Sequence, residues 1–461
     1  MTLSQQIAQH VATVRYEQLS PKAILMTKYS LLDALGVMLG ASGIGEGCDA
    51  FVQLASDSAA KPEATLLGCG MRTSASLAAL ANGAMAHALD FEDAHDGAPV
   101  HPNAQVVPAA LAVAESLQRI GGRELITAIA VGCDLVCRLG LCLTKPIDEY
   151  GWYPPPILGA FGATAAVAKL LKLDERQTLD AMSLTLCQVS CSAEIKHNPQ
   201  SVMRSIRDAF ASQTAVVSGQ LAQKGIRGFD QPFEGKAGFF NNFARGNFNA
   251  SVLTKELGER FEGENVSFKA WPACRGTHAY IDAALQLTRR HSIHSVDIES
   301  GRLIGHRIQR MLYEPLADKQ RPTTAIDAKF SLPFTVATAL LRRNVTLDSF
   351  KANALQDQDV LEMAKRLSFE VSTDPSASDN ATRGTLELAM KNGQIHSMHI
   401  ENPLGHTSRP MSDEDLRAKF VLCARHSRKP ILPARVDAIA DATLSLERVD
   451  DLDSSFFSVL C

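Results

Sequence analysis

The chain has 461 residues, more than the roughly 250–300 at which one hydrophobic core usually stops growing, so we expect two domains. Hydrophobic residues make up 46% and charged residues 21% of the sequence, which excludes a disordered or low-complexity protein. The formal net charge of -4 argues against nucleic acid as a partner, because that binding needs clustered Lys and Arg.

The N-terminal segment MTLSQQIAQHVATVRYEQ is polar and has neither the basic start nor the apolar core of a secretory signal. No uncharged apolar stretch approaches the ~18 residues of a membrane span, so we expect a cytoplasmic protein with no membrane partner. The ten cysteines form no CxxC pair and no zinc-type spacing. Cys133/Cys137 and Cys187/Cys191 are spaced to share a helix face, and we predict buried thiols, with adventitious metal or redox chemistry as the alternative.

Helical patterns fill the first two-thirds of the chain. Ser20-Pro21 is a helix start signal, and we expect that helix to end at Gly40. Five further runs are dense in Ala, Gly, Ser and Leu, small enough for helices to approach closely, and lack the alternation typical of strands. They span residues 74–89, 106–120, 124–139, 158–173 and 177–190. These patterns predict a large helical bundle.

The pattern changes after about residue 265. Strand-like pieces at residues 301–314, 366–373 and 384–400 alternate with helical ones at residues 277–290 and 331–341, which predicts an α+β insert. Helical character then returns, with Ser412 as the N-cap and acidic residues in the first turn. We therefore predict a mainly α protein with a discontinuous helical domain (residues 1–265 and 400–461) and a smaller α+β domain (residues 266–399).

Residues 87–109 form the segment richest in titratable groups. Such crowding is unfavourable unless the charges are shared or matched to a ligand, so the segment is a candidate for tuned acid–base groups. A solvated capping loop and a metal site remain alternatives, although HExxH and EF-hand spacings are absent. Its titratable residues are His87, Asp90, Glu92, Asp93, His95, Asp96 and His101.

A second candidate segment, residues 268–285, contains Lys269, Cys274, Arg275 and His278 around a proline turn that leads into a helix. The N-terminal end of a helix attracts anions, so a carboxylate substrate suits this place. The alternative is a solvated lysine beside a buried turn cysteine.

Two further segments are weaker candidates. In residues 151–163, consecutive prolines hold Trp152 and Tyr153 outside helical geometry, at a cavity wall or in ordinary packing. In residues 197–208, Arg204 and Arg207 lie three apart on a predicted helix and are either carboxylate ligands or surface charges. Dinucleotide, P-loop, GxSxG and CxxC motifs are absent, which favours chemistry without a cofactor.

These segments, in this order, resemble the MmgE/PrpD family, which includes 2-methylcitrate dehydratases, cis-aconitate decarboxylases and iminodisuccinate epimerase. The resemblance rests on HALDFEDAHDGAPVHPNAQVVPAALAVAE, FKAWPACRGTHAYIDAAL, FSLPFTVATALL and GHTSRPMSDEDLRAKF, and runs from about residue 5 to 440. It implies a helical domain, an inserted lid domain, a cleft between them and a homodimer. It also implies a small di- or tricarboxylate substrate, no metal and no organic cofactor.

The resemblance assigns Asp90 and His101 to the cleft, Lys269 to its lid lysine and Tyr313 to a cleft tyrosine. Four positions depart from the decarboxylase and dehydratase pattern, because other residue types are usual there. These are Ala94, Tyr153, Arg204 and Cys274.

The leading hypothesis is a cofactor-independent epimerase of a small dicarboxylate, with iminodisuccinate as the family precedent. Lys269 and Tyr153 are the expected opposing proton-transfer pair, supported by His101 and Asp90. The expected substrate-binding residues are Arg204, Arg275, Cys274, His278, Tyr313 and Asp93. The alternatives are a 2-methylcitrate-type dehydratase, a cis-aconitate-type decarboxylase and a non-catalytic carboxylate-binding homologue.

Overall fold

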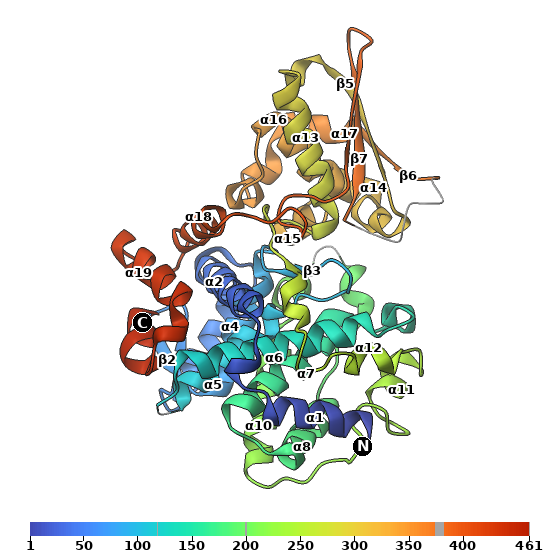
Figure 1. The fold of residues 1–461 in the computed structure, drawn as a ribbon. Coiled ribbons are helices and arrows are strands. Elements are labelled where there is room, and N and C mark those ends of the chain that lie inside the picture. Colours follow the sequence, from blue (N-terminus) through green and yellow to red (C-terminus); the bar gives the residue numbers. More distant parts are fainter. Residues whose placement is uncertain (118, 199–200, 374–381, 461) are drawn as a thin grey trace.

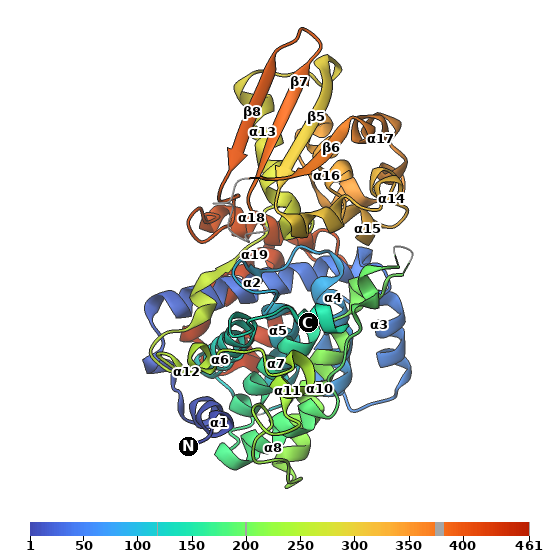
Figure 2. The same cartoon turned by 90° about the vertical axis from the view of Figure 1, so that its right-hand side faces the viewer.

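The computed structural model describes residues 1–117, 119–198, 201–373 and 382–460. Figures 1 and 2 show a larger part made of helices and a smaller part in which helices cover a sheet. The chain is thus mainly α with a smaller α+β portion, as its sequence predicts.

The larger part is built from two separate stretches of sequence. Its N-terminal helices are α1 (Leu3–Thr13), α2 (Pro21–Ile44), α3 (Cys48–Asp57), α4 (Ala75–Ala88), α5 (Asn103–Ser116), α6 (Gly122–Leu141), α7 (Pro154–Leu170), α8 (Glu175–Leu186), α9 (Met203–Ile206), α10 (Ala209–Gln223), α11 (Phe239–Ala244) and α12 (Ala250–Thr254). Its C-terminal helices are α18 (Asp413–Ala424), α19 (Pro433–Leu444) and α20 (Ser458–Leu460). Two short hairpins accompany them: β1 (Ala64–Leu66) with β2 (Met71–Thr73), and β3 (Ala94–His95) with β4 (Val266–Ser267).

Helix α2 begins as its sequence predicts but ends later. Ser20 is its N-cap, accepting a hydrogen bond from the Ala23 amide, and Pro21 is the first helical residue. The expected end at Gly40 is wrong, because the helix continues to Ile44. Gly40 serves packing instead, since a Cβ there would lie 3.0 Å from the Cys423 carbonyl oxygen of α18.

Small residues let the bundle helices pack closely. A Cβ at Gly162 in α7 would lie 2.5 Å from the Gly132 carbonyl oxygen of α6, so neither helix tolerates a side chain at this crossing. Among the described residues only α2 is long and apolar enough to span a membrane, and 72% of its most apolar window is buried inside the protein.

The smaller part contains a four-stranded sheet in the order β6-β5-β7-β8. Strand β5 pairs in parallel with β6 and antiparallel with β7, and β7 forms a hairpin with β8. The strand expected over residues 301–314 is only partly correct, because β5 ends at Gly305 and a 3-10 segment, η7 (Arg307–Leu312), follows. The elements are β5 (Ile298–Gly305), β6 (Leu367–Val371), β7 (Gly384–Met390), β8 (Ile395–Ile400), α13 (His278–Arg290), α14 (Leu316–Gln320), α15 (Ala325–Lys329), α16 (Leu332–Arg342) and α17 (Gln358–Lys365).

The buried apolar side chains form two clusters. One extends from Ile7 to Phe268 and resumes at Leu416, with Leu347 as an outlier in sequence. The other extends from Trp271 to Ile400. We propose that these clusters are the cores of two domains, which we call the helical part and the lid part. In Figure 1, β3, α15 and α18 lie where the two parts meet.

Candidate active site

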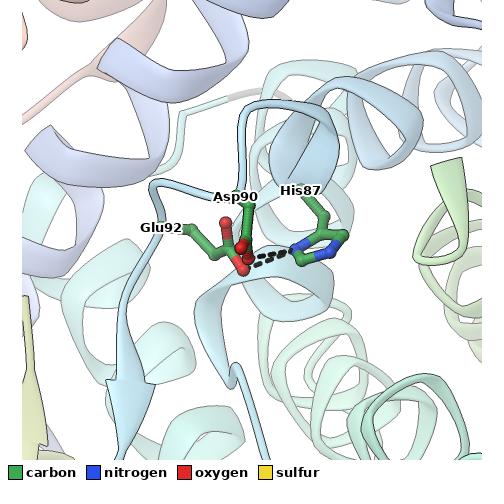
Figure 3. Close-up of side chains that lie close together, drawn as sticks. All are labelled: His87, Asp90 and Glu92. Carbon is green, nitrogen blue, oxygen red and sulfur yellow. Dashed lines mark hydrogen bonds and ion pairs between the residues drawn. The ribbon is translucent and has the colours of Figure 1, made fainter. Parts of the chain in front are cut away.

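The site is built on the loop that follows α4. His87 lies in the last turn of that helix, and Asp90 then adopts a left-handed backbone conformation (φ 48°) that few non-glycine residues accept. This turn brings Asp90 and Glu92 to the same side as His87, as Figure 3 shows. His87 Nδ1 lies 2.5 Å from Glu92 Oε1 and 3.9 Å from Asp90 Oδ1.

Lys269 joins this loop from a distant part of the chain. It follows β4, whose pairing with β3 fixes the segment beside the Asp90 loop. Its ammonium lies 2.6 Å from Asp90 Oδ1, 3.1 Å from the Asp90 carbonyl oxygen and 3.4 Å from Glu92 Oε1. All three side chains are buried, so this is a desolvated ion cluster.

His101 is held in one tautomer. Its Nδ1 lies 2.9 Å from the Asp93 carbonyl oxygen and 2.9 Å from Glu92 Oε1. Both partners are acceptors, so Nδ1 carries a proton, and in the neutral form of the ring the lone pair is on Nε2. The His101 side chain is 18% exposed, against 1% for Glu92, so it is the member of this pair that a ligand can reach.

Arg207 and Tyr153 continue the cluster on the other side of His87. The guanidinium donates through Nη1 to Tyr153 Oη at 2.7 Å, and its Nη2 lies 3.3 Å from His87 Nδ1. Because Tyr153 Oη accepts from Arg207, its own proton is free to point elsewhere. Arg207 is oriented in turn by Asp208, whose Oδ1 accepts a hydrogen bond from Gln105.

Burial and the neighbouring charges shift the pKa values of the groups in the cluster in different directions. Burial alone would lower the pKa of Lys269, but Asp90 and Glu92 outweigh it and raise that pKa above its ordinary value. Burial alone would raise the pKa of Glu92, but His87, Lys269 and His101 bring it well below the ordinary value. Burial and Arg207 together lower the pKa of His87. At neutral pH the site therefore holds an ammonium, an ionised Glu92 and a neutral His87.

The metal-site alternative can be tested against this geometry. His87, Asp90 and Glu92 each offer a ligand atom, and these atoms lie within 4.8 Å of one another. The Lys269 ammonium already pairs with both carboxylates, however, and a metal ion would have to displace it. The residues present favour the ammonium over a metal ion.

Three buried acceptors in the cluster have no hydrogen-bond partner among the described residues. They are His87 Nε2, Asp90 Oδ2 and Glu92 Oε2. Buried acceptors are normally satisfied by protein, ordered water or ligand donors. Donors from ordered water or a ligand would complete the hydrogen bonding of these three atoms.

A cavity of about 830 Å³ opens between the helical part and the lid part, and its lining includes none of the cluster side chains described above. Lys196 and Arg204 line it from the helical part, and Arg307, from η7, lines it from the lid part. Lys196 also lies 5.7 Å from the centre of the Tyr153 ring, so one residue of the cavity wall is close to the buried cluster.

Two guanidinium groups of the cavity wall, Arg204 and Arg307, have no carboxylate within 4.0 Å among the described residues. Arg204 stacks on the ring of Phe330 at 3.5 Å, and its buried Nε has no hydrogen-bond partner. Arg310, on the same wall, pairs with Glu314 at 3.6 Å. One unpaired guanidinium from each part suits a ligand with two carboxylates.

Comparison with known proteins identifies the family. A model of the MmgE/PrpD N-terminal domain matches residues 5–251, and a model of the MmgE/PrpD C-terminal domain matches residues 271–446. The chain belongs to the MmgE/PrpD family. Lys269 lies between the two matches, so the site of this MmgE/PrpD protein combines the N-terminal domain with the segment that joins the two domains.

The similar proteins are decarboxylases. A cis-aconitate decarboxylase from Homo sapiens is 24% identical over 461 residues, covering 98% of this chain and 93% of that protein. One from Mus musculus is 24% identical over 475 residues, covering 98% and 92%. One from Aspergillus terreus is 24% identical over 405 residues, covering 84% and 81%. By name these relatives act on cis-aconitate, and their similarity to this chain does not single out an epimerase.

The sequence-predicted catalytic residues Asp90, His101, Lys269 and Tyr153 lie in this cluster. Cys274 lies near it, close enough for Asp90 to raise the pKa of its thiol, in addition to the effect of burial. Asp93 lies behind His101, where Asn103 Nδ2 donates to it at 2.5 Å and burial raises its pKa to about 7. From this position Asp93 is better placed to orient His101 than to bind a substrate.

Three of the residues expected to bind substrate in this MmgE/PrpD protein bind other protein groups instead. Arg275 donates through Nε and Nη2 to the two oxygens of Asp96 at 2.8 and 2.9 Å. This pair of guanidinium donors is therefore already occupied by a carboxylate of the protein. His278 is buried and lies 3.1 Å from the Ala273 carbonyl oxygen through Nε2. Tyr313 packs on Phe369 and donates to a backbone carbonyl of β6.

Sequence reasoning missed three basic residues of the site. Arg207 was weighed only as one of a pair, and its fully buried position next to Tyr153 depends on the packing of α9 and α10. Lys419 lies within GHTSRPMSDEDLRAKF and Lys329 directly before FSLPFTVATALL, but neither lysine was singled out, although both are buried and bind the loop of Asp90.

Proposed function

We propose that this protein is a cofactor-independent epimerase that removes and returns the proton α to a carboxylate of a small dicarboxylate. The observation that carries the proposal is the fixed tautomer of His101, whose free Nε2 is on the only partly exposed ring of the cluster, beside a lysine held as an ammonium. A base and a cationic acid in one desolvated site are what proton transfer next to a carboxylate needs.

In the proposed reaction, the protonation states of His101, Lys269 and Tyr153 determine their roles. His101 Nε2 takes the α proton, and the electron pair moves into the carboxylate to form an enediolate that the Lys269 ammonium stabilises. Tyr153, whose own proton is free, returns a proton to the opposite face of the carbon. Starting from the other stereoisomer, the same steps run in reverse. This differs from the sequence-based hypothesis, in which Lys269 and Tyr153 form the opposing pair, because the raised pKa of Lys269 disfavours it as a base.

The unpaired groups of the cavity and the cluster support this substrate class. Arg204 and Arg307 suit two carboxylates, one from each part of the protein. The unpartnered acceptors of His87, Asp90 and Glu92 suit a ligand that carries N–H donors. An iminodisuccinate-like amino dicarboxylate offers both, whereas a tricarboxylate anion without N–H or O–H groups offers only acceptors.

Decarboxylation of a cis-aconitate-like substrate is the second candidate, and the similar decarboxylases favour it. Loss of CO2 leaves a carbanion at the carbon beside the remaining carboxylate, and Lys269 or His101 protonates it. The same cluster therefore serves either reaction, and the departures at Tyr153 and Arg204 favour the epimerase.

Proton NMR of the purified protein in D2O tests the proposal. The substrates are R,S-, S,S- and R,R-iminodisuccinate, with 2-methylcitrate and cis-aconitate alongside. Deuterium entering the α positions of iminodisuccinate as its stereoisomers interconvert supports the epimerase. An alkene or CO2 as product assigns the protein to the lyases, and carboxylate binding without any deuterium incorporation identifies a non-catalytic homologue. The expected homodimer stays a prediction, which light scattering after gel filtration tests.

A further inference from the structure

The backbone of the loop that carries Asp90 is bound by three buried ammonium groups. Lys329 donates to the Ala88 carbonyl oxygen at 3.2 Å, Lys269 to that of Asp90 at 3.1 Å and Lys419 to that of Phe91 at 2.5 Å. These lysines are 241, 179 and 328 positions away along the chain. A strained turn thus depends on contacts from three distant segments.

Lys419, on α18, makes a contact that the other two do not. Its ammonium also donates to the carbonyl oxygen of Lys269 at 2.9 Å. One charged group therefore binds the backbone on both sides of the Lys269–Asp90 ion pair. It lies 4.1 Å from the centre of the Phe91 ring as well, which restricts where the ammonium can lie.

Asp33, on α2, supplies the counter-charge. Its Oδ1 lies 2.6 Å from Lys419 Nζ, and the two side chains are 1% and 4% exposed. A buried ion pair of this kind is weak evidence for stability, because apolar residues of similar size often replace one without loss. Its geometry suits a role in placing the two backbone segments.

The pairing of β3 with β4 cannot by itself place the backbone of Asp90 relative to that of Lys269. It ends at Ala94 and Ser267, before either reacting group is reached. On the side of Asp90, the hydrogen bonds that reach the backbone of Lys269 and of Phe91 together come from the ammonium of Lys419. Lys329 joins Ala88 to Cys274, and Arg275 joins the segment to Asp96 on the other side of the hairpin.

We propose that Lys419, held by Asp33, is a positioning residue that sets the separation between the Lys269 ammonium and the carboxylates of Asp90 and Glu92. It contacts neither the cavity nor the reacting groups directly and acts through backbone carbonyls. The kinetic consequence rests on the proposed function, whereas the structural consequence does not.

The test uses the full-length variants Lys419→Met, Lys419→Arg and Asp33→Asn. Lys169→Met is the matched control, because Lys169 is a partly buried lysine that donates to a backbone carbonyl, that of Ala12, far from the site. Crystal structures, thermal unfolding and the kcat and KM of the substrate found by NMR are measured for each.

In Lys419→Met we expect Lys269 Nζ to move beyond hydrogen-bond distance of Asp90 Oδ1. We expect kcat to fall about 100-fold, with KM changed less than about threefold, because reacting groups are misplaced and not removed. Lys419→Arg, which retains the charge and can donate to both carbonyls, restores part of kcat, and Asp33→Asn has a smaller effect than Lys419→Met. Lys169→Met leaves both the site geometry and kcat unchanged.

Two results overturn the proposal. One is an unchanged Lys269–Asp90 distance in Lys419→Met. The other is a loss of kcat that Lys169→Met shares in proportion to its loss of thermal stability. If Lys419→Met does not fold, the comparison of Lys419→Arg and Asp33→Asn with wild type decides by the same criteria. If wild type turns over none of the substrates, the proposed function fails, and the crystallographic distance alone decides whether Lys419 positions the pair.

Discussion

Lys269 Nζ lies 2.6 Å from Asp90 Oδ1 and 3.4 Å from Glu92 Oε1, so one buried ammonium pairs with two carboxylates almost 180 positions earlier in the chain. Among the described residues, no other Lys or Arg nitrogen lies within 4.0 Å of either carboxylate, and the other close groups are the imidazoles of His87 and His101. The ion cluster is therefore sensitive to the loss of this one group.

Replacing Lys269 by Met is expected to lower kcat by roughly 10²–10⁴-fold, because the substrate loses the cation that stabilises the enediolate. It should also destabilise the fold by about 3–5 kcal/mol, since a buried carboxylate is left unpaired. Deuterium incorporation by NMR and urea unfolding measure the two effects. Lys351→Met, in an exposed ion pair with Asp348, is the control with little expected effect on either. Full turnover by Lys269→Met would remove Lys269 from the proposed mechanism.

Arg204→Ala and Arg307→Ala are expected to raise KM about 10- to 100-fold, because each removes a charge-assisted hydrogen bond to a substrate carboxylate. The change in kcat should be smaller, since these groups bind both ground state and transition state. Arg310→Ala is the matched control on the same wall, because Arg310 already pairs with Glu314. Equal effects of the three variants on KM would mean that only the general positive charge of the cavity matters.

The fold was predictable because its signals are local. Ser20-Pro21 and the Ser412 capping box mark helix starts that the structure confirms. The end of α2 was not predictable from the sequence. Gly40 looked like a helix end, but it lies inside the helix because α18 packs closely against it. That contact joins residues almost 400 apart, which no local pattern encodes.

The site was predictable only where one segment supplies it. Residues 87–101 carry their titratable groups at short spacing, and His87, Asp90, Glu92 and His101 do lie together, whereas His95 and Asp96 have other partners, Glu262 and Arg275. The choice of Arg204 over Arg207 could not be made from sequence, because both lie in one turn of helix and only packing decides which one is buried. Arg275 looked like a carboxylate ligand, and it does bind one, but that carboxylate belongs to Asp96.

Tyr153→Phe separates the two faces of the proposed reaction. The variant keeps the ring and loses the proton that Oη would deliver, so epimerisation should fall about 100-fold. Exchange of the α proton with D2O at the face of His101 should continue, because that step does not use the phenol. The measurement compares the two rates in one NMR time course. A parallel fall of exchange and epimerisation would show that Tyr153 acts on the whole site and not on one face.

Asp93→Asn is expected to change how stability depends on pH. Burial raises the pKa of Asp93 to about 7 in the folded protein, from an ordinary value of 3.8. Between these values the folded state holds the proton and the unfolded state has lost it, so this carboxyl makes the free energy of unfolding fall as pH rises. The slope is at most about 1.4 kcal/mol per pH unit and vanishes above the folded pKa.

The variant removes this contribution, since Asn103 can rotate its amide to present an oxygen to the new side chain. Its stability relative to wild type should therefore increase from pH 4 to pH 7 and stay constant from pH 7 to pH 8 in urea unfolding. Asp134, whose pKa is also raised by burial, to about 6, leaves a residual slope in both proteins, so the difference between them is the informative quantity. Asp57→Asn, at an exposed carboxyl, should give a curve parallel to wild type. A parallel curve for Asp93→Asn would instead mean that Asp93 is ionised in the folded protein and pairs with a positive charge near His101.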